Sequence, residues 1–542
     1  MSLPCRTKFG TSASLYVEPG IVALGALLIC ASAGLLSVVL GPDNYWDLGF
    51  YHLYAPWAYL HERYLYDVAP AEWQSYFNPV ADFLFYGLTS SILNGTPRII
   101  AFIMGAVHGL NVVLVVAIAW HVLRPRGRWA RVALCAAATL IGVSGAGFVP
   151  LLGTTSNDLV NSIFVLGALL GILRIAGSSS ERTAWRDFAW PGLSAGVGLG
   201  LKYTAAVYIP GLAVIALLAA ARRRAPAGLV VFSVSAALGF LALGGHHLLT
   251  LWRDFGNPVF PMLNNIFQSP YYDPISAADD QFRPRDLWQM IAYPFYWIKT
   301  NIYLVSEKPL RDWRGAIAYL AIFAALVTRL VRLVHDEPRR NAVGESCGLG
   351  LVFIFVIISY FAWALAFGNY RYGVTLEMLT GVAIVGALIL VMWGRLLRIG
   401  AAVVLLIVAA ATTVYPDWGR GRYGDRYIDV RVPPLPPNSV VLIASGQPVA
   451  YFIPFAEPTA QFLGIENDFL KLSQHNRLVS EIKSLMRTSG RPKFIVSVGE
   501  FNSGRLDHLL AQFDLALGRS PCQPIWSNLE YPALSLCPAV PR

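Results

Sequence analysis

The chain has little charge and few cysteines for its length. Asp, Glu, Lys and Arg make up only 14% of its 542 residues, and there are six cysteines. A disordered chain is rich in charge and poor in aromatic residues, whereas this one is 56% hydrophobic and 13% aromatic. A small secreted fold held by disulfides needs a far higher density of cysteine. Both classes are therefore excluded, and the composition indicates an integral membrane protein.

The net charge of +10 does not indicate a nucleic-acid partner. Membrane proteins concentrate Lys and Arg in the short loops on the cytoplasmic side, and this bias sets their orientation. In this chain the arginines gather between apolar runs, as in the segments 124–128, 222–224 and 395–398. The basic residues therefore indicate the orientation of a membrane protein rather than a surface for nucleic acid.

Eleven apolar runs are expected to cross the membrane, because about 20 helical residues cover a hydrocarbon core of about 30 Å. The expected spans are 21–40, 98–122, 129–150, 158–176, 188–203, 204–220, 228–250, 313–333, 347–368, 374–394 and 399–415. The segment 79–93 is also apolar, but it is short and carries Asp82. We interpret it as an interfacial or re-entrant helix, with a short span as the alternative. Eleven spans place every arginine cluster inside with the N-terminus, and the C-terminus outside.

Three segments then face the outer compartment: a first loop, 41–97, a long loop, 251–312, and the residues after 415. The last part alternates strand-like and helix-like stretches. We therefore expect a transmembrane module, 1–415, and a small periplasmic α/β domain, 416–542. Cys522 and Cys537 are the only pair of cysteines on the outer side, so they are the candidates for a disulfide.

The first outer loop concentrates acidic and aromatic residues. Its part 41–79 has five carboxylates against a single arginine, although the whole chain is basic: Asp43, Asp47, Glu62, Asp67 and Glu72. Its aromatic residues suit helices in the headgroup layer, and they also suit the faces of sugar rings. Tyr51, His52 and Trp57 are the candidates for substrate contact. The alternative is an interfacial belt with solvated carboxylates.

These features together resemble the GT-C superfamily of polytopic glycosyltransferases, which includes the protein mannosyltransferases and the bacterial aminoarabinose transferases. The shared features are a retained first span, an acid just beyond it, interfacial aromatic helices, many further spans and an outer C-terminal domain. The resemblance covers about residues 20–415. It implies transfer of a sugar from a polyprenyl-phosphate donor to an acceptor hydroxyl, usually with inversion, and a carboxylate of the first loop as general base.

Two carboxylates compete for the role of the base. Many GT-C members carry an Asp-Glu pair followed by an aromatic residue about four positions on, and this sequence has Asp47 with Tyr51 at that offset, without the Glu. Asp43 is the other match, but it directly follows Gly41-Pro42 and is equally explained as the end of the first span. We therefore predict Asp47 as the base that accepts the hydroxyl proton.

A leaving phosphate needs positive charge at the outer surface. Arg371 lies between Tyr370 and Tyr372, where a planar guanidinium can grip phosphate and the rings can pack on prenyl or sugar. It resembles the late arginine that several GT-C enzymes use on the lipid phosphate, and an interface anchor is the alternative. Lys202 follows a Gly-rich apolar run and needs an anionic partner, either phosphate or Asp158. Asp158 is interpreted either as a second acid of the site or as a residue that caps a helix.

Other chemistry has weaker support. His246-His247 ends the seventh span, but no cysteine or close acid completes a ligand set, so a divalent cation is only a minor alternative. A transporter or lipid flippase would place ionisable groups at mid-span and show two related halves. A non-catalytic assembly partner in envelope-glycan synthesis is the other alternative. We predict a glycosyltransferase of the bacterial inner membrane that works on the periplasmic face, among membrane lipids, on a lipid, glycan or protein acceptor.

Overall fold

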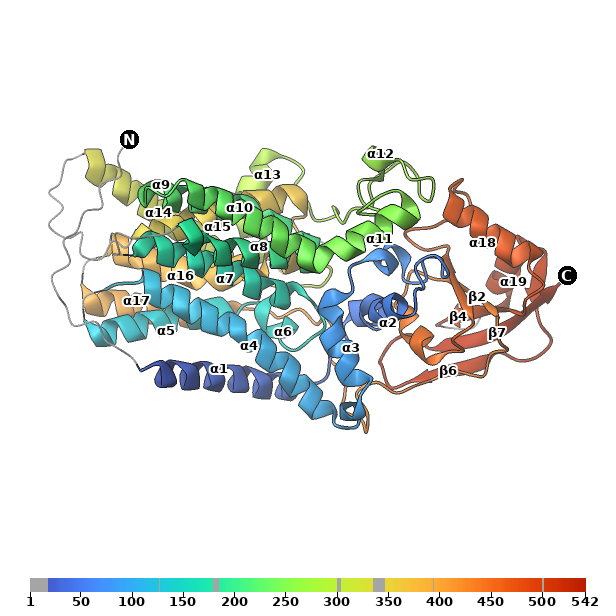
Figure 1. The fold of residues 1–542 in the computed structure, drawn as a ribbon. Coiled ribbons are helices and arrows are strands. Elements are labelled where there is room, and N and C mark those ends of the chain that lie inside the picture. Colours follow the sequence, from blue (N-terminus) through green and yellow to red (C-terminus); the bar gives the residue numbers. More distant parts are fainter. Residues whose placement is uncertain are drawn as a thin grey trace.

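The structure is a computed structural model that describes residues 18–125, 127–178, 185–299, 304–334, 347–392, 394–499 and 502–542. A bundle of long helices forms one end of the molecule and a sheet domain forms the other (Figure 1). The short helices of the first outer loop lie between the two.

Nine helical segments among the described residues are long and apolar enough to cross a membrane, in agreement with nine of the eleven predicted spans. They are α1 (Pro19–Leu40), α4 (Pro97–Val122), α7 (Asp158–Gly177), η6 with α9 (Tyr203–Arg222), α10 to α11 (Ala227–Phe255), α14 (Arg314–Val334), α15 (Cys347–Ala366), η10 with α16 (Tyr370–Val391) and α17 (Arg395–Thr412). Three of these segments consist of more than one element. In the first, η6 (Tyr203–Tyr208) continues into α9 (Ile209–Arg222), and in the second, η10 (Tyr370–Gly373) continues into α16 (Val374–Val391). The third consists of α10 (Ala227–Phe240), η7 (Leu241–Gly245) and α11 (His246–Phe255).

The two remaining predicted spans are present as shorter helices. In place of 129–150 the structure has α5 (Arg128–Val143), with 16 residues, and in place of 188–203 it has α8 (Ala189–Leu201), with 13. Helix α5 ends before a turn that leads into the short α6 (Phe148–Leu151). Helix α8 ends where Lys202 adopts an extended backbone. Both pack against long helices, α5 on α16 and α17, and α8 between α7 and α10.

The segment 79–93 forms short helices, η3 (Val80–Asp82) and α3 (Phe83–Thr89), and η4 (Ile92–Gly95) overlaps its end. Val80–Thr89 is too short to cross a membrane, which favours the interfacial or re-entrant interpretation. The other short helices of the outer loops are η1 (Leu48–His52), α2 (Tyr54–Leu60), η2 (Glu72–Tyr76), α12 (Asn264–Phe267), α13 (Leu287–Ala292) and η8 (Tyr293–Ile298).

Small residues allow α1 and α4 to lie close together. A Cβ added to Gly105 would collide with Ser37, and one added to Gly109 would lie 2.8 Å from the Cα of Cys30. Such small residues are typical of helix contacts within membranes, where attraction comes from close packing. This contact fixes the end of α1, from which the first outer loop starts.

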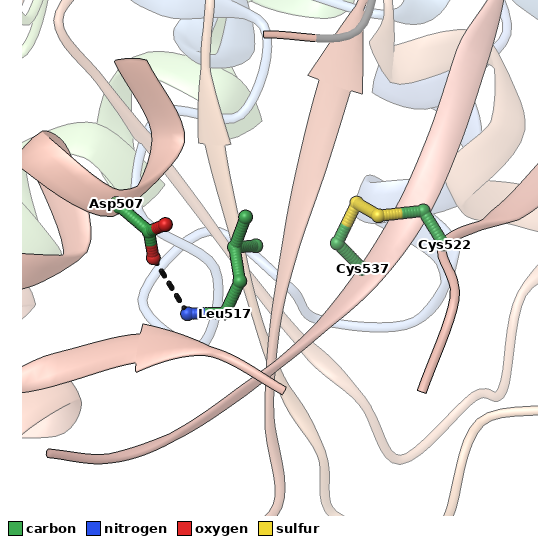
Figure 2. Close-up of a disulfide and its surroundings, with 4 residues drawn as sticks. All are labelled: Asp507, Leu517, Cys522 and Cys537. Atoms are coloured by element: carbon green, nitrogen blue, oxygen red, sulfur yellow. Dashed lines mark hydrogen bonds between the residues drawn. A yellow bond between two sulfur atoms is a disulfide. The ribbon is translucent and has the colours of Figure 1, made fainter. Parts of the chain in front are cut away.

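The C-terminal part is a seven-stranded sheet with two helices, α18 (Arg477–Thr488) and α19 (Ser503–Ala511). Strands β3, β2 and β4 are parallel, and β4, β7 and β6 are antiparallel. The strands are β1 (Val430–Arg431), β2 (Val440–Ala444), β3 (Gln461–Ile465), β4 (Lys493–Val498), β5 (Leu515–Leu517), β6 (Gln523–Ser527) and β7 (Leu534–Pro541). The candidate disulfide is present between Cys522 and Cys537 (Figure 2).

The first outer loop pairs directly with this sheet. Val68 lies beside Leu463 in parallel register, so the loop covers the free edge of β3. Asp67 accepts hydrogen bonds from Arg63 at 2.8 Å and from the backbone N–H of Phe462 at 2.9 Å. These groups are buried, so the two proposed domains, 1–415 and 416–542, are joined by ordered contacts rather than by a flexible linker alone.

Candidate active site

Asp47 stands at the start of a π-helical turn that also carries His52. The turn is η1, and Asp47 is its N-cap. Hydrogen bonds of a π-helix join residues five positions apart, so Asp47 and His52 lie one turn apart on the same side. Turns of this kind are rare and occur often at functional sites.

A chain of alternating charges connects four elements at this end of the bundle. Nη1 of Arg371 donates to Oδ2 of Asp47 at 2.9 Å, and Nε of Arg371 lies 3.6 Å from Oδ2 of Asp158. Nζ of Lys202 donates to Oδ1 of Asp158 at 2.7 Å. The four side chains are between 3% and 17% exposed, so the charges are largely removed from water and need each other. The structure thus brings both predicted cations to the predicted base.

Two tyrosine rings flank the cations. The guanidinium of Arg371 lies 5.2 Å from the ring centre of Tyr45 and 5.0 Å from that of Tyr372. Nζ of Lys202 lies 5.4 Å from the ring centre of Tyr372. Such cation–π contacts stabilise a positive charge where water is scarce. The structure thus brings Tyr372 next to both cations, and it adds Tyr45, which the sequence did not single out.

Tyr370 belongs to a different, buried network. Its hydroxyl donates to Glu377 at 2.5 Å and contacts Asp312 at 2.9 Å. Glu377 also accepts the backbone N–H groups of Gly147 at 2.7 Å and Phe148 at 2.8 Å. Tyr370 thus ties η10 to the turn before α6. The Tyr370 hydroxyl therefore contacts this buried network and not the charge chain of Asp47, Arg371, Asp158 and Lys202.

Asp43 is saturated with hydrogen bonds. One carboxylate oxygen accepts from the backbone N–H and the hydroxyl of Thr155, at 2.7 Å and 2.6 Å, and the other accepts from the N–H of Tyr45 at 2.9 Å. Asp43 is 2% exposed. In Asp47, by contrast, Oδ1 has no hydrogen-bond partner among the described residues. This difference favours Asp47 over Asp43 as the proton acceptor.

The three loop residues predicted to contact substrate lie in different surroundings. His52 is fully buried, with Nδ1 2.6 Å from Oδ1 of Asp82, and Asn157 donates to the same oxygen at 2.8 Å. The ring of Tyr51 lies 4.1 Å from the ring of His52. Trp57 instead stacks on His61, 5.0 Å between ring centres, away from the charge chain.

Burial and neighbouring charges shift the pKa values of Asp47 and His52. Burial raises the pKa of Asp47 to about 6, and the positive charges of His52 and Lys202 limit the rise. The pKa of His52 is also raised, because the contact with Asp82 outweighs the opposing effect of burial. A carboxyl that titrates near neutral pH is well matched to general-base chemistry.

The long outer loop contributes two carboxylates that sequence reasoning did not single out. Asp279 accepts a hydrogen bond from the hydroxyl of Tyr372 at 3.0 Å, and Glu307 accepts one from Asn369 at 2.7 Å. Burial raises the pKa of Glu307 to about 7. Both lie in a loop with many charges and no regular pattern, so the sequence carried no signal that selected them. Asp82, in contrast, is recognisable in the sequence, because it is an acid in an apolar segment.

The predicted histidine pair has a structural explanation. Nδ1 of His246 lies 2.9 Å from the hydroxyl of Tyr59, and Nε2 of His247 lies 3.1 Å from the carbonyl oxygen of Tyr76. Both contacts hold α11 against the first outer loop. Across the part of the chain that the structure describes, there is no group of three or more His, Cys, Asp or Glu placed to hold a metal ion.

Comparison with known proteins identifies the family. The model of glycosyltransferase family 87 matches residues 83–359, about half of the chain, and the chain belongs to this family. The predicted glycosyltransferase class is thereby confirmed, and an enzyme is favoured over a transporter. No curated protein matches the chain.

The solved structures to which the chain is similar include an oligosaccharyltransferase and ArnT. The apo oligosaccharyltransferase of Archaeoglobus fulgidus is 13% identical with a TM-score of 0.41, over 92% of this chain and 71% of that one. ArnT from Cupriavidus metallidurans, bound to undecaprenyl phosphate, is 12% identical with a TM-score of 0.36, over 96% of this chain and 98% of that one.

The pKa of Asp47 generates a prediction about pH. Sugar transfer is expected to be nearly constant above a pH of about 7 and to fall as the pH drops through about 6, because a protonated Asp47 cannot accept a proton. The measurement is kcat/KM against pH. His52→Gln should move this fall to higher pH, since removal of the positive charge favours the neutral carboxyl.

Glu307→Gln is the control for this measurement. The pKa of Glu307 lies at about 7, and this carboxyl is close to the charge chain, so it could produce a similar profile. In Glu307→Gln, kcat/KM should still fall as the pH drops through about 6. A profile that becomes flat in Glu307→Gln and does not move in His52→Gln would contradict the assignment to Asp47.

Proposed function

We propose that the protein transfers a sugar from a polyprenyl-phosphate donor to an acceptor hydroxyl, with inversion and with Asp47 as general base. The observation that carries the proposal is the contact of 2.9 Å between Asp47 and Arg371, which supports a pairing of the proposed proton acceptor with the proposed phosphate-binding cation. Family membership supplies the reaction class. The acceptor is a lipid, a glycan or a protein.

The proposed step moves one proton and one sugar. The acceptor oxygen attacks the anomeric carbon, its proton passes to Oδ1 of Asp47, and the bond from the carbon to the phosphate oxygen breaks with its electrons on the phosphate. A single carboxylate suffices, because a phosphate leaving group needs no protonating acid, unlike the sugar that leaves in glycoside hydrolysis. The free Oδ1 of Asp47 supports this role, since Oδ2 is held by Arg371.

Arg371 and Lys202 are the proposed partners of the donor phosphate. An ammonium group has three donors, and among the described residues Lys202 uses one of them, on Asp158. The guanidinium of Arg371 is oriented by Asp47 and by the hydroxyl of Tyr372, which accepts from Nη2 at 3.1 Å. Asp158 holds the two cations close together before the donor binds. The negative charge that develops on the leaving phosphate would then be stabilised without rearrangement.

The proposed location is the bacterial inner membrane, with the N-terminus in the cytoplasm and the C-terminal domain in the periplasm. The arginine-bearing starts of α5 and α17 lie at the end of the bundle opposite the sheet domain (Figure 1). Such a separation of basic turns from the outer loops is what the positive-inside rule requires.

Reporter fusions test this topology. Fusions at Arg223 are expected to report from the cytoplasm, and fusions at Gly446 and Cys522 from the periplasm, because only this orientation keeps the arginine clusters inside. Paired alkaline phosphatase and fluorescent reporters give opposite signals on the two sides. A cytoplasmic signal at Gly446 would place Asp47 on the wrong side of the membrane and overturn the proposed donor.

Asp47→Asn tests the base. The variant should fold and bind donor like the parent, because an amide oxygen still accepts from Arg371, while turnover falls by about 10²-fold or more. Asp43→Asn should mainly lower thermal stability, since it loses hydrogen bonds to Thr155. Asp280→Asn, on the exposed part of the long loop, is the matched control. Parent-like turnover in Asp47→Asn would refute the assignment.

Arg371→Lys tests the phosphate contact with the charge retained. A lysine keeps the charge but lacks the planar fork with which a guanidinium grips phosphate, so donor affinity and transfer are expected to fall at least about tenfold. Binding of the lipid phosphate is measured separately from transfer. Arg283→Lys is the matched control, because Arg283 is half exposed and lies outside the charge chain. Unchanged donor affinity in Arg371→Lys would reduce Arg371 to an anchor.

A further inference from the structure

A polar cavity lies in the C-terminal domain, apart from the charge chain at Asp47. Its volume is about 220 Å³, and it is bounded by the ends of β2 and β4 and by α19. Its polar lining consists of Ser497, Asn502 and Arg505, and the rest is aliphatic. No carboxylate is among the described residues that line it.

The strand order explains why the cavity forms at this point. After β2 the chain passes to β3 on one side, and after β4 it enters α19 and continues to β5, which pairs with β7 on the other side. The two connections leave in opposite directions, so a crevice opens between the carboxyl ends of β2 and β4. In open α/β sheets such switch points are where ligands bind.

Ser497 points to a ligand. Its side chain lines the cavity, the residue is only 4% exposed, and its hydroxyl has no hydrogen-bond partner among the described residues. Its Oγ keeps some accessible surface, so the hydroxyl can be reached from the cavity. A ligand atom in the cavity would supply the missing partner.

The neighbouring donors favour an anion. Arg505 brings a positive charge to the cavity, and the first N–H groups of α19 have no partner within the helix. Asn502 caps the helix by accepting from the N–H of Arg505 at 3.0 Å. The helix is held in place by Asp507, which accepts from the N–H of Leu517 at 2.9 Å (Figure 2). A fixed helix N-terminus with an arginine and a hydroxyl is a suitable cradle for phosphate or carboxylate.

The cavity lies at the carboxyl end of β2, and the chain that follows this strand reaches the first outer loop. The chain that leaves β2 forms η11 (Ala450–Phe455), which packs on η1. Pro448, on the same connection, approaches Gly49 so closely that a Cβ there would lie 2.7 Å from it. A ligand in the cavity would therefore lie at the same end of β2 as the connection that packs on the Asp47 turn.

We propose that this cavity is an anion-binding site. It takes the phosphate or carboxylate group of a small ligand, which is held by the guanidinium of Arg505, the hydroxyl of Ser497 and the N–H groups at the start of α19. Its volume is below that of pockets for drug-sized molecules, so the bound part is a small group. The site does not depend on the proposed transfer reaction, because its test measures binding alone.

The test is calorimetric titration of inorganic phosphate into the full-length protein in nanodiscs of neutral lipid. The phosphate binding that is lost in Arg371→Lys is assigned to the site at Asp47. Arg505→Ala should weaken the remaining part at least about tenfold, because it loses a charged hydrogen bond, and Ser497→Ala should weaken it about two- to tenfold. Arg519→Ala, which changes the same charge on an exposed residue of the same domain, should have no effect.

Nanodiscs with anionic lipid distinguish the source of the anion. If the ligand is a lipid headgroup, the component that depends on Arg505 should disappear from the phosphate titration, because the lipid already fills the site. If it is a free anion, the component should persist. The proposal is wrong if Arg505→Ala and Ser497→Ala bind phosphate like the parent, or if Arg371→Lys alone removes all binding.

Discussion

The site depends on one constraint: its buried charges must be paired. Asp47 and Arg371 are 324 positions apart in the chain, yet their side chains meet at 2.9 Å. A buried charge without a partner destabilises a protein by several kcal/mol, commonly about 3 to 5. The first loop, the start of α7, the start of η6 and η10 must therefore come together, or each would carry an unpaired charge into the interior.

A second set of buried charges supports the first. Arg314 donates to Asp312 at 2.6 Å, and Tyr370 connects Asp312 to Glu377. This network holds η10 against the turn before α6, and Arg371 is the next residue after Tyr370. The position of the cation at the site is thus set by groups that do not contact it, as is common where geometry must be held closely.

The sequence predicted the architecture better than the site. Long apolar runs identify spans directly, because hydrocarbon thickness sets their length, but α5 and α8 are shorter than their apolar runs. For Lys202 the sequence predicts an anionic partner, either phosphate or Asp158, because a lysine in apolar surroundings needs an anion. In the structure Lys202 contacts Asp158.

Most of the other long-range pairs could not be predicted from the sequence, for a physical reason. The contact of Asp47 with Arg371 and that of His52 with Asp82 are tertiary, and no local periodicity encodes them. Glu377 is different: an acid inside an apolar run is a recognisable sign of a buried partner, and that sign was present in the sequence. Asp279 and Glu307 sit in a loop without regular structure, where sequence pattern offers no guide.

The pairing of Val68 with Leu463 has a consequence for biosynthesis. A ribosome that adds about 5 to 20 residues per second needs about 20 to 80 s to pass from one residue to the other. During that interval the aromatic first loop has no sheet edge to cover and no η11 to pack on. The nascent chain therefore exposes an unfinished surface that chaperones must shield, and a product that stops short of β3 leaves the loop exposed for quality-control proteases to recognise.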